Sequence, residues 1–295
     1  MNGKYRKLFL IGNGFDRWQG LSTSYDQFRK YYRSNIRAVT EELHIKTTVN
    51  EEGDLITPVE MIYGEIFSPE ALPEEFFWNF ESSTALLDDQ NIINYFGKSD
   101  RGLYNLQETV REAREILQKI FGDWIKSVVI DPADSGYRFD DSCYFINFNY
   151  TDTLQKRFGV DQKNDYHIHG EADDPENIVF GHSTHPETAF QELMEQKLIR
   201  TLDGKKSKRL RGLYLIEELC MLKGVRELPS NCFSILGAAD YIDGGHAPRK
   251  ENARWHISYY SDEDKKRIER VMQRTGCDNF ELHQGIDECI MGVKV

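Results

Sequence analysis

The stretch that decides the fold is Leu8-Phe9-Leu10-Ile11-Gly12-Asn13-Gly14-Phe15-Asp16, close to the start of the 295-residue chain. Residues 5–11 become almost wholly apolar toward their end, which is typical of a strand buried on both faces of a parallel sheet. This strand leads directly into Gly12 and Gly14, whose backbone can turn sharply and approach a ligand closely. The pattern predicts an α/β protein with a site at the carboxyl end of its first strand.

Strands and helices are expected to alternate along the rest of the chain. Short aromatic and β-branched runs predict strands at residues 143–148, 166–169, 178–180, 232–236 and 255–259. Helical spacing predicts a helix capped by Thr23-Ser24, a long helix over about 103–128 and a last helix beginning at 261–264. We therefore expect a Rossmann-like α/β fold with a mostly parallel sheet flanked by helices.

The domain organisation follows from the same pattern. We expect one α/β domain over residues 1–295, with a helical insertion or lobe at approximately 40–130. The first part of that lobe is expected to be helical but irregular, with breaks at Pro58, Pro69 and Pro73.

Composition excludes several classes of protein. Hydrophobic residues make up 39% and aromatic residues 12%, which is enough for a packed core and excludes an intrinsically disordered chain. No apolar run reaches the roughly 18 residues of a membrane span, and the apolar run near the start is too short for a signal peptide. We therefore expect no membrane partner. The five cysteines are scattered and form no CxxC pair, so we expect a protein of the reducing cytoplasm. The net charge of −12 argues against nucleic acid as a partner of the whole surface.

Two groups of polar residues lie where predicted strands end. Asn147 and Asn149 occupy alternate positions in Phe145-Ile146-Asn147-Phe148-Asn149-Tyr150-Thr151-Asp152, so a strand would place them on one face. His167 and His169 are related in the same way, with Gly170 beside them. Asx turns that close a strand and structural histidines are the alternative interpretation. We expect Asn149 and His169 to lie near a cavity rather than in the core.

The histidines also allow a metal-dependent nuclease or phosphohydrolase as an alternative. Neutral imidazoles suit zinc and other transition metals, and the residues concerned are His167, His169, His182 and His185. The basic run Lys205–Arg211 would then contact phosphate. No acidic ligand motif accompanies these histidines, so we assign no metal ligand and no resident cofactor.

Taken together, the motifs resemble the AbiH family of bacteriophage abortive-infection proteins. The matching blocks span nearly the whole chain: Leu10–Asp16, Gly20–Tyr25, Trp78–Glu81, Asn147–Leu154, His167–Gly170 and Ile178–His182. The chain departs from the family at Leu236–Asp243, where Gly-His-Ser-Leu-Gly and an acidic residue are usual. More distantly, the order of motifs is similar to that of sirtuin-like NAD-binding domains, without the four zinc cysteines of deacetylating sirtuins.

This resemblance implies a sirtuin-like fold and an antiviral effector that binds NAD and hydrolyses its nicotinamide–ribose bond. NAD or a related nucleotide would be the substrate, and a second copy of the chain and a phage-derived trigger are further implied partners. The catalytic residues would be Asn149, His169 and Asp152. The nucleotide-binding residues would be Gly12, Asn13, Gly14, Phe15, Asp16, Ser24, Asn147 and Gly170.

The residue chemistry is compatible with these roles. Asn149 would orient the ribose or the attacking water, and His169, with an ordinary pKa near neutrality, would be the general base. Asp16 would hold ribose hydroxyls, and Asp152 would hold the ribose or orient another polar group. A nucleotide-binding sensor without turnover is the other alternative, and the altered Gly237–Asp243 segment favours it.

Overall fold

The computed structural model describes residues 6–50, 52–67, 100–132, 136–141, 143–167, 169–178, 225–231, 254–275 and 278–293. These residues fall into two compact units. The described parts of residues 1–22, 128–171 and 207–295 form the first unit, and those of residues 23–127 and 172–206 form the second.

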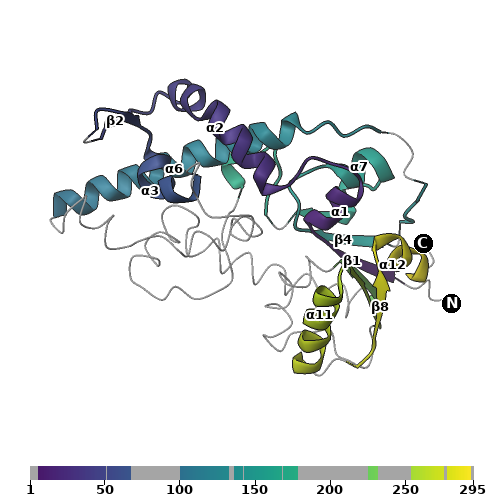
Figure 1. Ribbon diagram of the computed structural model, residues 1–295. Helices are drawn as coiled ribbons and strands as arrows, with labels where there is room; N and C mark the ends of the chain where they lie inside the picture. The colour runs from purple at the N-terminus through teal and green to yellow at the C-terminus, as the bar shows by residue number, and fades with distance from the viewer. Residues whose placement is uncertain are drawn as a thin grey trace. The chain divides into compact units, whose positions relative to one another are not determined.

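The first unit is built on a six-stranded parallel sheet. Its strands are β1 (Arg6–Ile11), β4 (Cys143–Asn147), β5 (Asp165–His167), β6 (Val225–Asn231), β7 (Arg254–Tyr259) and β8 (Phe280–Gln284). Their spatial order is β5-β4-β1-β6-β7-β8, and every neighbouring pair is parallel. Figure 1 labels β4, β1 and β8 of this sheet. From β1 the chain adds β4 and β5 on one side and then β6, β7 and β8 on the other, so the direction in which strands are added reverses beside β1. The prediction of a parallel α/β sheet is confirmed.

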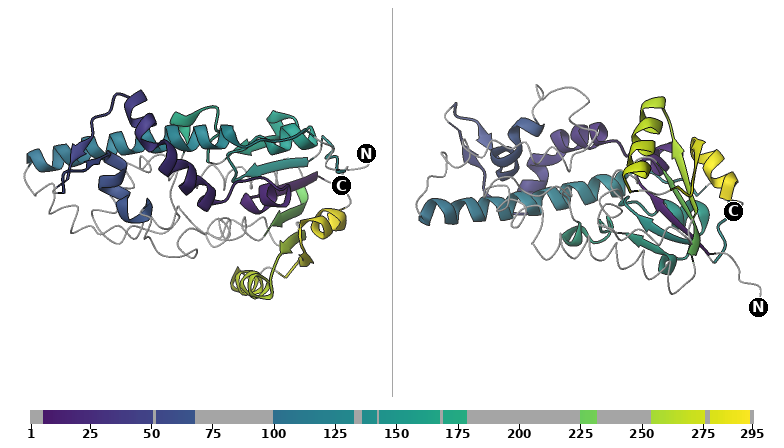
Figure 2. Two further views of the ribbon diagram at one scale, coloured as in Figure 1. Left: turned by 45° about the horizontal axis from the view of Figure 1, so that its top comes forward. Right: turned by 90° about the horizontal axis from the view of Figure 1, so that it is seen from below.

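Helices cover the sheet of this unit. The helices α1 (Asn13–Trp18), α7 (Thr153–Phe158) and α12 (Ile286–Val293) share a core with β1 and β4, and the short η3 (Gln162–Asn164) precedes β5. The core side chains are Phe9, Ile11, Phe15, Cys143, Phe145, Leu154, Phe158, Ile286 and Ile290. The fourth helix, α11 (Asp262–Thr275), packs on β7, and Figure 2 shows α11 and α12 on opposite sides of the strands.

The second unit is mainly helical. In it, α6 (Asp100–Ser127) packs against α2 (Tyr25–Glu42) and α3 (Pro58–Phe67), and η4 (Pro175–Asn177) packs on α6. The rings of Phe28 and Phe121 meet edge to face at 4.9 Å. A small hairpin of β2 (Thr48–Val49) and β3 (Leu55–Ile56) joins α2 to α3.

Several of the predicted strands and helices are present in the structure, and one expectation was wrong. The strands expected near 143, 166 and 255 are β4, β5 and β7, and the long helix is α6. Pro58 begins α3 instead of breaking a helix, because the first helical position needs no N–H donor. The strand expected at 232–236 lies outside the described residues, as does most of the one at 178–180. Among the helices described, none is long and apolar enough to cross a membrane.

Candidate functional site

The carboxyl ends of three neighbouring strands bring most of the predicted site residues to one edge of the sheet. Ile11, the last residue of β1, pairs with Asn147, the last residue of β4, and Asn147 pairs with His167, the last residue of β5. The chain after β4 then crosses toward β1, where the Phe148 N–H donates to the carbonyl oxygen of Ile11 at 2.8 Å. Parallel pairing thus places the glycine turn, the asparagines and a histidine side by side.

Asn149 fixes the turn after β4 against the glycine turn after β1. Its side-chain Nδ2 donates to the carbonyl oxygen of Gly12 at 3.1 Å, and its backbone N–H donates to Asn147 Oδ1 at 2.9 Å. Asn149 is only 5% exposed, and its expected place near a cavity stays a prediction. Its amide supplies the partner that the buried Gly12 carbonyl requires.

A buried ion pair lies at the end of β5. His167 Nε2 is 3.0 Å from Asp165 Oδ2, and these side chains are 4% and 0% exposed. The same carboxylate oxygen accepts from Asn147 Nδ2 at 3.2 Å and from Gln155 Nε2 at 2.8 Å. Asp165 therefore joins β4, β5 and α7 through one oxygen atom. Its other oxygen is buried and has no hydrogen-bond partner among the described residues.

Both ring nitrogens of His167 have polar partners among the described residues. Nδ1 lies 2.9 Å from the carbonyl oxygen of Asn149, which can only accept, and Nε2 faces the Asp165 carboxylate. Burial alone would lower the pKa of His167, but the hydrogen bond and charge of Asp165 outweigh it and raise the pKa above its ordinary 6.5. We infer that His167 is a structural residue that holds the asparagine loop.

Asp16 is a second buried acid at this edge. It is 1% exposed, and its two oxygens accept hydrogen bonds from Thr151 Oγ1 at 2.6 Å and Thr153 Oγ1 at 2.8 Å. Burial raises its pKa to about 6, although both threonine hydrogen bonds and His167 act in the opposite direction. Asp16 thus attaches α1 to the start of α7. Its assignment to ribose hydroxyls stays a prediction.

The raised pKa of Asp16 predicts how stability depends on pH. A pKa that rises from 3.8 to about 6 on folding stabilises the native state only while the acid is protonated, so this contribution, about 3 kcal/mol in full, is lost as pH rises through about 6. Asn does not titrate, so the unfolding free energy of Asp16→Asn minus that of wild type should increase by up to about 3 kcal/mol between pH 4 and pH 7. Urea denaturation of both proteins at several pH values measures this difference.

The control for this prediction is Asp262→Asn, which replaces an exposed acid in α11 of the same unit. The free energy of unfolding of this variant should follow that of wild type at every pH. Parallel curves for Asp16→Asn and wild type would contradict the assignment of a raised pKa to Asp16.

His169 differs from His167 in position and surroundings. β5 ends at His167, and His169 is a half-buried residue in the turn that follows, so the two do not share a strand face. Nδ1 of His169 is 3.1 Å from the Tyr150 hydroxyl, and its ring meets those of Phe148 and Tyr150 nearly edge-on. Gly170 adopts the positive φ of 87° that turns the chain away. His169 is thus held by aromatic neighbours in a turn, whereas His167 is held by an acid on the strand.

The remaining predicted residues have varied positions. Asp152 is half exposed and pairs with Lys156 at 3.0 Å. Asn13 is partly buried, Gly14 is buried, and Phe15 is buried against the ring of Phe158. Ser24 belongs to the second unit, where its hydroxyl accepts from the Gln27 N–H as part of a capping box for α2. Outside the described residues are His182, His185, Lys205–Arg211 and Gly237–Asp243.

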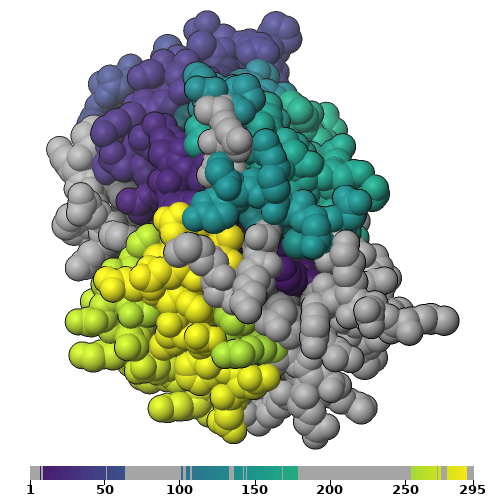
Figure 3. Space-filling model, turned by 90° about the vertical axis from the view of Figure 1, so that its right-hand side faces the viewer, coloured from purple at the N-terminus to yellow at the C-terminus, as the bar shows by residue number. Residues whose placement is uncertain are grey.

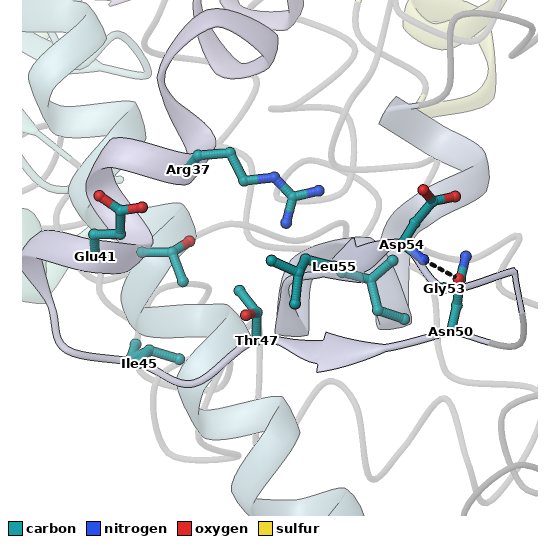
Figure 4. A pocket seen from close by; sticks show the side chains of 10 residues that line it. Arg37, Glu41, Ile45, Thr47, Asn50, Gly53, Asp54 and Leu55 are labelled. Atoms are coloured by element: carbon teal, nitrogen blue, oxygen red, sulfur yellow. Dashed lines mark hydrogen bonds between the residues drawn. The ribbon is translucent and has the colours of Figure 1, made fainter.

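A pocket of about 730 Å³ lies in the second unit, between the end of α2 and the hairpin (Figure 4). Arg37 and Glu41 lie on its α2 side, and Asn50, whose Oδ1 accepts from the Asp54 N–H at 2.7 Å, lies on its hairpin side. None of the predicted site residues lines this pocket, so it gives the nucleotide hypothesis no support.

Sequence reasoning missed Asp165, Gln155, Thr151 and Thr153. An acid directly before Tyr166-His167 was the available signal for Asp165, but its role depends on the register between β4 and β5. These residues hold the predicted ones in place.

Sheet and site together define an α/β protein with a preorganised polar cluster at the carboxyl edge of a parallel sheet. The sequence model of the family described as bacteriophage abortive infection AbiH matches residues 8–218, more than half of the chain. The chain therefore belongs to the AbiH family, and with it to the proteins of phage abortive infection, a defence role. No curated protein and no solved structure matches the chain.

Proposed function

We propose that this chain is an abortive-infection effector that binds NAD at the carboxyl edge of its sheet and hydrolyses the nicotinamide–ribose bond. The observation that supports this best is the meeting of the Gly12 turn, the Asn147–Asn149 loop and the end of β5 beside the strand where the winding order reverses. Dinucleotides bind at such switch points in doubly wound sheets. We therefore interpret the sheet as Rossmann-like, in keeping with the similarity of its motifs to those of sirtuin-like NAD-binding domains.

The proposed reaction consumes one water molecule per NAD. The bond between the anomeric carbon and nicotinamide breaks, the electron pair leaves with the neutral nicotinamide, and the water oxygen bonds to the carbon. His169 takes the proton of that water, because both ring nitrogens of His167 already contact Asp165 and Asn149 inside the site. Backbone groups at Gly12 and Gly14 would lie along the diphosphate, and the half-exposed Asp152 would hold a ribose hydroxyl.

The buried network has a different role in this proposal. His167 Nδ1 lies 2.9 Å from the carbonyl oxygen of Asn149, and Asn149 Nδ2 donates to the carbonyl oxygen of Gly12 at 3.1 Å. Such a network keeps a loop in one geometry before substrate arrives, which lowers the entropic barrier to reaction. Asn149 would act on the ribose chiefly by fixing the backbone of its loop.

A second candidate is a nucleotide sensor without turnover. The specific observation in its favour is that Asp16 uses both carboxylate oxygens internally and Asn149 uses its amide nitrogen internally. A site whose polar groups are already satisfied can bind a nucleotide through backbone and shape while offering few groups for chemistry.

Incubation of the purified full-length chain with NAD separates the two candidates. Chromatographic release of nicotinamide and ADP-ribose is the expected result and supports hydrolysis. An NAD-dependent rise in melting temperature without release would favour the sensor. If NAD causes no release of products and no rise in melting temperature, NAD is excluded as the ligand.

A further inference from the structure

A cluster of metal-ligating side chains lies elsewhere in the first unit, on the last two strands of the sheet. Nδ1 of His256 is 3.1 Å from Nε2 of His283, and the same Nδ1 is 3.8 Å from Oε2 of Glu281. One potential ligand atom from each residue lies within 4.8 Å of those of the other two. In the described part of the chain, these three residues are the group of histidine, cysteine or acidic side chains that is compact enough to hold a metal ion.

Strand register explains why the three side chains meet. β7 and β8 are parallel neighbours, in which His256 pairs with Glu281 and Ser258 pairs with His283. Paired residues on adjacent strands point to the same face, and residues two apart on one strand do so as well. His256, Glu281 and His283 therefore share one face of the sheet, and neither a flexible loop nor a second unit is needed to complete the cluster.

The spacing of the nitrogens fits a shared metal ion. With zinc–nitrogen bonds of about 2.0–2.1 Å in tetrahedral geometry, two imidazole nitrogens lie roughly 3.3 Å apart. The observed 3.1 Å is close to this distance, and the two rings are inclined by only 22°. Two neutral imidazoles and one carboxylate form a ligand set that zinc commonly uses, with a fourth position left for water or substrate.

The surroundings allow an ion to enter. The side chain of His256 is 4% exposed, but that of Glu281 is 46% exposed, and β8 is the outermost strand of the sheet. Residues 254–275 and 278–293, yellow-green to yellow in Figure 3, form part of the molecular surface. Glu281 also accepts from Arg254 Nη2 at 2.6 Å, so an arginine now balances the carboxylate charge.

We propose that a divalent transition-metal ion binds here, with zinc as the expected ion. Its ligands are His256 Nδ1, His283 Nε2 and the Glu281 carboxylate. This site is separate from the proposed nucleotide edge, and it lies beyond residues 8–218 that match the AbiH family. It also differs from the metal hypothesis drawn from the sequence, which used His167, His169, His182 and His185. Three protein ligands leave zinc one open position, the arrangement of sites that activate water.

The test uses zinc alone on the purified full-length chain. The protein is stripped with EDTA, incubated with Zn²⁺, desalted and analysed by mass spectrometry of metals. One zinc ion per chain is expected, together with a higher melting temperature that EDTA reverses. Co²⁺ in place of zinc should give the intense visible absorption of a tetrahedral site. A wild-type chain that leaves desalting without zinc and shows no Co²⁺ spectrum would overturn the proposal.

Matched variants assign the ion to these residues. His283→Asn and Glu281→Gln should weaken zinc binding by more than the roughly 10–100-fold that loss of an outer-shell partner costs. Arg254→Gln removes the same ion pair as Glu281→Gln but keeps all three ligands, so it should retain zinc. His44→Asn removes an exposed histidine of the second unit and should also retain it.

The variants remain informative if one of them fails to fold. His256 is the most buried ligand, so His283→Asn and Glu281→Gln are judged first, after their melting temperatures in EDTA are shown to match that of wild type. Folded His283→Asn and Glu281→Gln that both retain one zinc per chain would overturn the assignment. The contact between His256 and His283 would then be a neutral N–H···N hydrogen bond within the sheet.

Discussion

The His169→Ala variant is expected to hydrolyse NAD at least about 100-fold more slowly than wild type, because a positioned general base contributes roughly 10²–10⁴-fold to the rate. His169 is the candidate base because it is half-buried in the turn after β5, where it contacts Phe148 and Tyr150 on either side of Asn149. The measurement is nicotinamide release over time, followed by chromatography at saturating NAD.

Binding should survive this substitution. The proposal assigns the diphosphate to the backbone around Gly12 and Gly14, so the NAD-dependent rise in melting temperature is expected in His169→Ala as in wild type. His44→Asn is the matched control, because His44 is exposed, belongs to the second unit and has a φ of 55° that asparagine tolerates. Equal turnover in His169→Ala and wild type would exclude His169 as the base.

Tyr150→Phe tests how His169 is held. It removes the hydroxyl that lies 3.1 Å from His169 Nδ1 and keeps the ring that packs edge-on against the imidazole. A positioning role predicts slower turnover with an unchanged melting temperature, at a cost smaller than that of His169→Ala. A lower melting temperature with unchanged turnover would indicate a purely structural contact.

Sequence patterns predicted the part of the fold that depends on local chemistry. The apolar run into Gly12 and Gly14 is β1 with its turn, and Ser24 caps α2 through a capping box with Gln27. Two strands were missed for physical reasons. β6 contains Pro229, which cannot donate to a ladder and argues against a central strand, yet this residue pairs with His256. β8 has only two apolar residues, Phe280 and Leu282, among its five positions, so no run of apolar residues indicated a strand.

The candidate site was only partly predictable, because its contacts depend on register. Asn147 and His167 were found as polar residues at strand ends, and pairing of β4 with β5 brings them together. The sequence could not show that β5 ends at His167. Because it ends there, His167 lies on the strand and His169 lies in the turn that follows, with different neighbours. The sequence also could not show that His256 and His283, 27 positions apart, are neighbours across two strands. Spacing along a chain carries no information on such pairs until the sheet order is known.

The Asp165→Ala variant is expected to lose about 3–5 kcal/mol of unfolding free energy, the range found when one partner of a buried ion pair is removed. Asp165 Oδ2 accepts from three side chains, His167, Asn147 and Gln155, at 2.8–3.2 Å. Without it, the imidazole of His167 and the amides of Asn147 and Gln155 lose their acceptor, and nothing compensates their lost hydration. Because whole domains are stable by only about 5–15 kcal/mol, this loss should be evident in urea denaturation.

The pH dependence of this loss identifies its cause. Asp165 raises the pKa of His167 in the folded state, so the pair stabilises fully below the unfolded pKa of 6.5, and the stabilisation falls as pH rises through the folded-state pKa. The difference between wild type and Asp165→Ala should therefore be largest in mildly acidic solution. Asp152→Ala, which breaks the exposed pair with Lys156, should change stability by no more than about 0.5 kcal/mol at any pH. A loss in Asp165→Ala as small as this, or one independent of pH, would show that Asp165 and His167 form no ion pair.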